Sequence, residues 1–198
     1  MYDIQSAEYR TLDKDVVDLI IWNDQFQQYI PLTIVLSKEN NGFIHYDESI
    51  LRQWIEENED KIIYDEEKLK SEEIDRQKML LLQKTELAFK DMISQGFIPS
   101  VSDKRFYARY DDIQKLKSGY DLAVLSGAEQ MEIKTLDGVI TLSIDNVKKA
   151  LAELGEHYQK MLQKKWQYEE QIKNCQDLEC LKNINIDFSD VANSDSSS

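Results

Sequence analysis

The alternation of hydrophobic and polar residues is clearest between Gln130 and Asn174. Residues on both sides of Asp137-Gly138 alternate in polarity, and this dipeptide favours a tight hairpin turn because both residues tolerate positive φ. A helical pattern follows at once, with large side chains recurring at spacings of three and four residues. The eight a and d positions of this pattern, which we call the seam, are Val147, Leu151, Leu154, Tyr158, Met161, Lys165, Tyr168 and Ile172. The seam predicts one long amphipathic helix with a polar break at Lys165.

The seam can be buried in two ways, and the sequence leaves both open. It can pack inside the chain against a second apolar stripe at residues 81–93, or it can form a coiled coil with another chain. A helix over residues 145–174 would be about 45 Å long, roughly twice the length of that stripe. We therefore expect the Met161–Ile172 part to meet a copy or a partner. The candidate partner-binding residues are Val147, Leu151, Leu154, Tyr158, Met161, Tyr168 and Ile172.

The first 64 residues have the pattern of a small α+β module. Val16–Trp22 and Tyr29–Leu36 are rich in β-branched and aromatic residues and predict two strands. Pro31 places the second strand at an edge, because proline cannot donate a ladder hydrogen bond. After a loop at Asn40–Gly42, Asp47 is the predicted N-cap of a short helix.

Residues 65–95 predict a second long helix, which acts as a connector. Its first half is highly charged, its second half carries the apolar stripe, and Gly96 follows as the expected C′ residue. Beyond it we expect a short strand at Arg105–Ala108, a third helix capped by Asp111 or Asp112 and ended by Gly127, and a helical turn from Asp177. The core should include Trp54, Phe89, Leu116, Tyr120, Leu151 and Leu154.

Together these patterns predict the α+β class with four parts. They are a small strand-helix module at 1–64, a helical connector at 65–95, a domain with a β-hairpin and one long helix at 96–188, and a disordered tail at 189–198. The tail is assigned from its polar, small and acidic residues.

The charge of the chain limits its partners. The 198 residues carry a formal net charge of -14, from 38 acidic and 24 basic residues. Such a surface repels nucleic acid and anionic membranes, so we expect neither as a partner. The sequence shows no apolar run of about 18 residues and no secretory signal pattern at its start, which predicts a protein made in the cytoplasm.

Residues suited to catalysis or metal binding are scarce. His45 and His157 have no second ligand at metal spacing, so we expect no metal and no cofactor. Cys175 and Cys180 are interpreted as reduced thiols, and His157 as a helix-surface residue rather than the base of a cysteine nucleophile. There is no glycine-rich phosphate loop. Two tyrosines and two arginines within residues 105–110 hint at an aromatic-basic patch but are too few to predict one. These observations argue against an enzyme.

The order of motifs in the C-terminal half resembles a known protein family. These motifs are Gln95–Phe97, Arg105–Gln114, Leu136–Gly138, Thr141–Ser143 and Asp177–Asp187. They resemble uncharacterised proteins of tailed bacteriophages and prophages that accompany tail-fibre and tail-fibre-assembly genes. The likeness spans residues 93–188, with Met131 where tryptophan is usual, and residues 22–64 are more loosely similar to the N-terminal module of tail-fibre accessory proteins.

The resemblance implies a non-enzymatic structural or assembly role, in the virion or at the tail fibre. The partners would be other phage structural proteins or copies of the chain itself. The alternative is an acidic intracellular inhibitor that mimics nucleic acid and occupies a host protein. A mimic would string carboxylates along one continuous face. Acidic residues here are dispersed and mixed with lysine, which favours the structural role.

Overall fold

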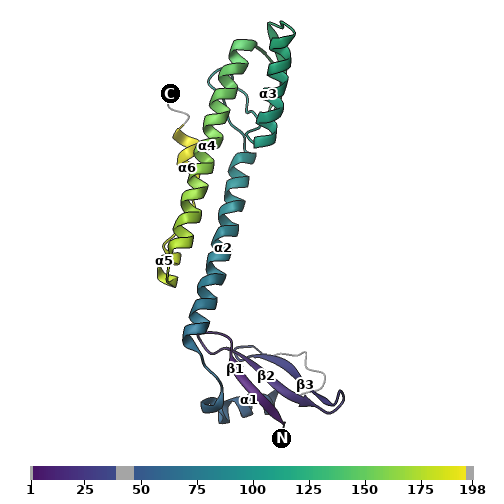
Figure 1. Cartoon of the computed structure of the whole chain (residues 1–198), viewed down its shortest axis with the longest axis vertical. Coiled ribbons are helices and arrows are strands. Elements are labelled where there is room, and N and C mark those ends of the chain that lie inside the picture. Colours follow the sequence, from purple (N-terminus) through teal and green to yellow (C-terminus); the bar gives the residue numbers. More distant parts are fainter. Residues whose placement is uncertain (1, 39–46, 195–198) are drawn as a thin grey trace. The chain divides into compact units, whose positions relative to one another are not determined.

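The chain combines strands and helices in two compact units. The computed structural model describes residues 2–38 and 47–194, with side chains through residue 191. The predicted α+β class is confirmed. Unit 1 is Met1–Asp75 and unit 2 is Arg76–Ser198, and Figure 1 labels the elements of both. The division falls inside helix α2 (Glu66–Ser94), so the predicted connector is shared between the two units.

Unit 1 is built on a three-stranded antiparallel sheet. Its strands are β1 (Ile4–Tyr9), β2 (Val16–Asn23) and β3 (Gln28–Val35), in the order β1-β2-β3. Alternate residues of β2 point into the core, and Val17, Leu19 and Ile21 are fully buried. Pro31 lies on β3 at the sheet edge, as predicted. The sequence pattern missed β1, because only two of its six side chains are buried and its polarity therefore does not alternate cleanly.

A short helix covers part of this core. Helix α1 (Glu48–Glu57) begins at Asp47, whose carboxylate accepts a hydrogen bond from the Ser49 N–H at 3.0 Å, which confirms the predicted N-cap. Leu51 and Ile55 are buried, whereas Ile50 is exposed. A 3-10 turn follows at Glu59–Lys61. The predicted loop at 40–42 and His45 lie outside the described residues.

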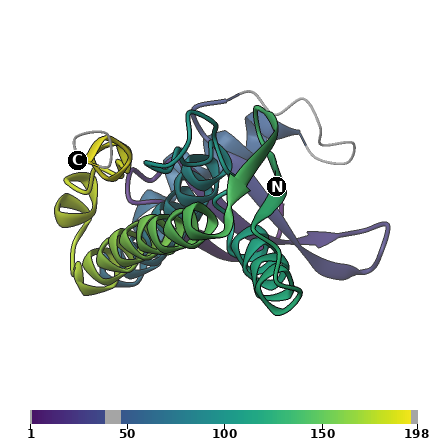
Figure 2. The same cartoon turned by 90° about the horizontal axis from the view of Figure 1, so that it is seen from above.

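Unit 2 is organised around the predicted hairpin and long helix. After α2 come α3 (Tyr110–Leu125), β4 (Gln130–Thr135), β5 (Gly138–Ser143), α4 (Ile144–Asn174), α5 (Leu178–Lys182) and α6 (Ser189–Ser194). Helix α4 starts directly after β5, and the Ser143 side chain caps it by accepting from the Asn146 N–H at 3.3 Å. The hairpin therefore leads straight into the long helix. Helix α3 lies beside α4 (Figure 2).

The hairpin turn lies one residue earlier than predicted. Thr135 pairs with Gly138, so the turn residues are Leu136 and Asp137, and Gly138 begins β5 with φ +122°. The turn is held from outside the hairpin. The Leu136 N–H donates to the Arg105 carbonyl at 2.8 Å, and the Arg105 N–H donates to the Asp137 carboxylate at 2.8 Å. This tertiary contact selects the turn position, which strand alternation alone could not do.

Several element ends differ from the prediction. The residue at the N-cap of α3 is Arg109, and the two aspartates proposed as caps lie in the first turn, where their charge still stabilises the helix N-terminus. The strand predicted at 105–108 is only a single bridge between Phe97 and Phe106. By contrast, the end of α2 agrees with the prediction: Gly96 follows the helix with φ +79°, and an added Cβ there would lie 2.5 Å from the Phe106 carbonyl oxygen.

Part of the C-terminal segment is more ordered than predicted. Residues 189–194 form α6 where a disordered tail was predicted, and the rest of that tail, 195–198, lies outside the described residues. Cys175 and Cys180, predicted to be reduced, form a disulfide. The physical reason is local, since Asp177 caps α5 by accepting from the Cys180 N–H and thereby brings the two Cα atoms to 5.6 Å.

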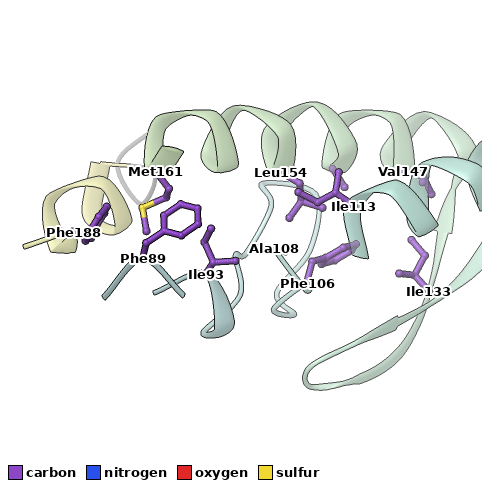
Figure 3. Packing of buried hydrophobic residues seen from close by; sticks show 11 residues of the cluster. Phe89, Ile93, Phe106, Ala108, Ile113, Ile133, Val147, Leu154, Met161 and Phe188 are labelled. Carbon is purple, nitrogen blue, oxygen red and sulfur yellow. The ribbon is translucent and has the colours of Figure 1, made fainter. Parts of the chain in front are cut away.

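The core of unit 2 joins residues from all its main elements. It contains Phe89, Ile93, Phe106, Ala108, Ile113, Ile133, Val147, Ala150, Leu154, Met161 and Phe188 (Figure 3). Of the predicted core residues, Phe89 and Leu154 are buried, while Trp54, Leu116, Tyr120 and Leu151 are only half-buried. The apolar stripes of α2 and α4 thus meet within one chain.

Candidate partner-binding site

The predicted partner-binding seam is largely covered by the chain itself. Val147, Leu154, Met161 and Ile172 are 0% exposed, and Leu151, Tyr158 and Tyr168 are half-buried. The structure therefore contradicts the prediction that Met161 and Ile172 are left for another chain. The reason is the C-terminal segment: the Tyr168 hydroxyl donates to the Asp187 carbonyl at 2.8 Å, and its ring lies 5.6 Å from that of Phe188. The C-terminal segment, which places Phe188 in the same buried cluster as Met161, therefore supplies part of the cover.

The polar break in the seam is an ion pair. Lys165 Nζ lies 2.5 Å from Glu86 Oε2 and 5.1 Å from the centre of the Phe89 ring. Burial lowers the pKa of Lys165, but the hydrogen bond and charge of Glu86 outweigh it and the pKa is raised. The hydrogen bonds from Lys165 and Lys90 lower the pKa of Glu86. This pair links α4 to α2 within the chain, and we expect it to set the register between the two helices.

The residues considered for catalysis are used for structure. His157 is buried and stacks on Phe97 with ring centres 4.7 Å apart, so its interpretation as a helix-surface residue is wrong. The disulfide occupies the sulfurs of both Cys175 and Cys180. Among the residues that the structure describes, no group of three or more His, Cys, Asp or Glu side chains could hold a metal ion.

The aromatic-basic residues at 105–110 divide between two places. Arg105 forms an ion pair with Asp137 at 2.6 Å and, with its backbone N–H, lowers the pKa of that carboxyl to about 2. Arg109 and Tyr110 instead line a cavity of about 340 Å³, which we call the aromatic pocket. Its lining residues are Phe89, Lys90, Ile93, Arg109, Tyr110 and Tyr158. The sequence offered a signal for this pocket only at Arg109 and Tyr110, because the other residues come from two distant helices.

The aromatic pocket has an apolar floor and a basic rim. Phe89 and Ile93 are buried, whereas Lys90, Arg109 and Tyr110 are exposed. Tyr158 forms one wall, and its ring centre lies 6.2 Å from that of Phe89 and 5.9 Å from that of Tyr110. The arrangement can hold an apolar group while presenting cations to its polar end.

A second surface lies at the C-terminal end of α3. Leu122, Val124 and Leu125 are 68%, 47% and 83% exposed, and we call these three residues the α3 tip. The helix stops just beyond them, where the Ala128 N–H donates to the Ala123 carbonyl at 3.0 Å. The α3 tip is therefore a short apolar surface held at a fixed helix end.

No known protein family, curated protein or solved structure matches the chain. The candidate sites are therefore judged on their geometry. In the described parts of the chain, no helix is both long enough and apolar enough to cross a membrane.

Proposed function

We propose that this chain is a non-enzymatic assembly or structural protein of a tailed bacteriophage, acting through protein–protein contacts at the virion or tail fibre. The biological setting rests on the order of motifs in residues 93–188 alone, for which no family model gives a match. The exposed α3 tip supports the mode of action, and it is the single observation that carries the proposal.

The energetic argument rests on the two leucines of the tip. Fully burying a leucine side chain is worth about 1.5–3 kcal/mol relative to leaving it exposed. Leu122 and Leu125 lie three residues apart and so share one face of α3, where a single apolar partner surface can cover both. Covering them offers a partner several kcal/mol, since contiguous exposed apolar groups mark interaction sites. The partner we propose is another structural protein of the phage.

The ion pairs bear on the alternative of a nucleic-acid mimic. A mimic needs carboxylates that remain available along a surface. Here, acidic side chains on several elements are paired, as in Glu8–Lys68 at 2.6 Å, Glu86–Lys165 at 2.5 Å and Asp137–Arg105 at 2.6 Å. This pairing reduces the support for the inhibitor.

The test replaces the tip leucines with a polar residue that suits a helix. The double variant Leu122→Gln/Leu125→Gln should keep the wild-type circular dichroism spectrum, because exposed substitutions usually change stability by less than about 0.5 kcal/mol. It should lose association with phage tail proteins in purified particles or tail-assembly intermediates. The matched control is Leu80→Gln/Leu87→Gln on α2, whose side chains are 47% and 68% exposed. Wild-type association by the tip variant would contradict the proposal.

A further inference from the structure

We infer that the aromatic pocket binds a short peptide segment in which a carboxylate neighbours an aromatic side chain. The pocket is separate from the α3 tip and made by different residues. The inference goes beyond the proposed function. It rests on that function in one respect, because it assumes that the partner is a protein.

The shape and lining of the pocket favour an aromatic group. Its volume of about 340 Å³ is at the lower end of the range for ligand pockets, which suits one or two side chains. Buried Phe89 and Ile93 form an apolar floor. The rings of Tyr110 and Tyr158 lie 5.9 Å apart with their planes tilted by 43°, which leaves ring edges and faces available to a third ring.

The charges at the rim favour a carboxylate. None of the lining residues is acidic, although the chain has 38 acidic residues. Glu86 is the acid paired with Lys90, at 3.1 Å, and it is also paired with Lys165, which in turn lies 3.6 Å from Glu169. Lys90 and Arg109 are the charged residues of the lining, and both are cations. A ligand carrying one or two carboxylates therefore complements the rim despite the negative net charge of the chain.

Arg109 is suited to bind that carboxylate. Its carbonyl accepts hydrogen bonds from the Asp112 and Ile113 N–H groups, both at 3.0 Å, which fixes its backbone at the start of α3. Within the described parts of the chain, its guanidinium forms no ion pair, and its side chain is exposed. A guanidinium can bind a carboxylate through two parallel hydrogen bonds, which sets the orientation as well as the charge of the ligand.

A peptide fits this pocket better than a nucleotide, the other anionic aromatic ligand. A nucleobase carries polar atoms along its edge that need hydrogen-bond partners when buried. The floor residues Phe89 and Ile93 offer none through their side chains. A phenylalanine or tryptophan ring makes no such demand on the floor, so the apolar interior and basic rim point to an acidic-aromatic segment.

The test uses nuclear magnetic resonance on the full-length, isotope-labelled protein. The probe is the peptide Gly-Ser-Asp-Trp-Glu-Gly-Ser, titrated to about 2 mM, because a ligand of this size binds weakly. We expect saturable shifts at the backbone amides of Lys90, Arg109 and Tyr110. A peptide with Asn and Gln in place of its acids, and one with Ala in place of Trp, should each bind at least about tenfold more weakly.

Variants of the protein complete the test. The Arg109→Gln variant should bind the Asp-Trp-Glu peptide about tenfold or more weakly than the wild type. Lys149→Gln on α4 makes the same change in net charge at an exposed position outside the pocket and should leave binding unchanged. The spectrum of each free variant shows whether it is folded. Should Arg109→Gln be misfolded, Lys90→Gln and the neutral peptide provide the same comparison.

Three results would overturn the inference. These are no saturable shift at the pocket amides, equal binding of the neutral or alanine peptide, and binding of adenosine monophosphate as tight as that of the acidic-aromatic peptide. Each is distinguishable from failure of the proposed function. The double glutamine variant at the α3 tip should bind the peptide normally, so peptide binding and partner association can fail independently.

Discussion

Met161 provides a direct test of whether the seam packs within one chain. Its side chain is 0% exposed and belongs to the unit 2 core, where Figure 3 shows it beside Phe89. If another chain covered this position, truncating the side chain would weaken assembly and leave the single chain stable. Because the chain itself covers it, the variant Met161→Ala should instead destabilise unit 2.

The expected loss follows from the atoms removed. Met161→Ala deletes three side-chain heavy atoms, which at about 0.8 kcal/mol per methylene-sized group removes about 2.5 kcal/mol of transfer free energy. A residual cavity of about 50 Å³ adds about 1 kcal/mol, at roughly 24 cal/mol per Å³. The free energy of unfolding should therefore fall by about 3–4 kcal/mol, inside the range of about 2–5 kcal/mol for buried methionine truncations.

The assay is urea unfolding followed by circular dichroism at 222 nm, which reports chiefly on the helices of unit 2. Met79→Ala is the matched control, because it makes the same chemical change on α2 where the side chain is 55% exposed, and it should cost less than about 0.5 kcal/mol. A Met161→Ala loss below about 0.5 kcal/mol, with a change of oligomeric state in sedimentation equilibrium, would refute burial within the chain.

Three further predictions concern interactions between elements. A double-mutant cycle of Lys165→Met and Glu86→Gln, measured by urea unfolding, should show a favourable coupling of about 1 kcal/mol, and zero coupling would remove the register role of the pair. The pKa of Asp137 is depressed to about 2, so its contribution to stability is present above pH about 4 and is lost as the pH falls toward about 2. Urea unfolding at several pH values should show that the free energy of unfolding falls less across that pH window in Asp137→Asn than in the wild type. An equal fall in both proteins would contradict the role given to Asp137. Reducing the disulfide should cost about 2 kcal/mol, as expected for its short loop. Reduction should leave hydrogen exchange of the core amides slow, because the disulfide stabilises only the segment around it. Fast exchange of the core amides after reduction would contradict this.

The elements that could be predicted are those whose determinants are local. The hairpin and α4 followed from side-chain alternation and helical spacing, and the cap at Asp47 followed from one side chain and its own backbone. The elements that were missed depend on distant partners. Strand β1 is specified by pairing with β2 rather than by its own polarity, and the hairpin turn is positioned by Arg105.

The expectation that Met161 and Ile172 are left for another chain was wrong for a similar reason. An apolar helix face must be buried, but its spacing does not say what buries it. The cover for Met161 includes Phe188, which comes from the far end of the chain. The α3 tip could not be predicted either, because the spacing of Leu122, Val124 and Leu125 does not show that all three stay exposed. Exposure is a property of the assembled unit and cannot be deduced from one helix.

Site-specific cross-linking at the α3 tip tests the central claim most directly. A photoreactive benzoylphenylalanine at Leu125 should cross-link to a phage tail protein during particle assembly, because this side chain is 83% exposed at the proposed contact. The same group at Leu87, 68% exposed on α2, is the control and should give no such product. Mass spectrometry identifies the captured protein. The account predicts a phage tail structural protein captured from position 125 alone. Capture of a host protein from position 125, or equal capture from both positions, would contradict it.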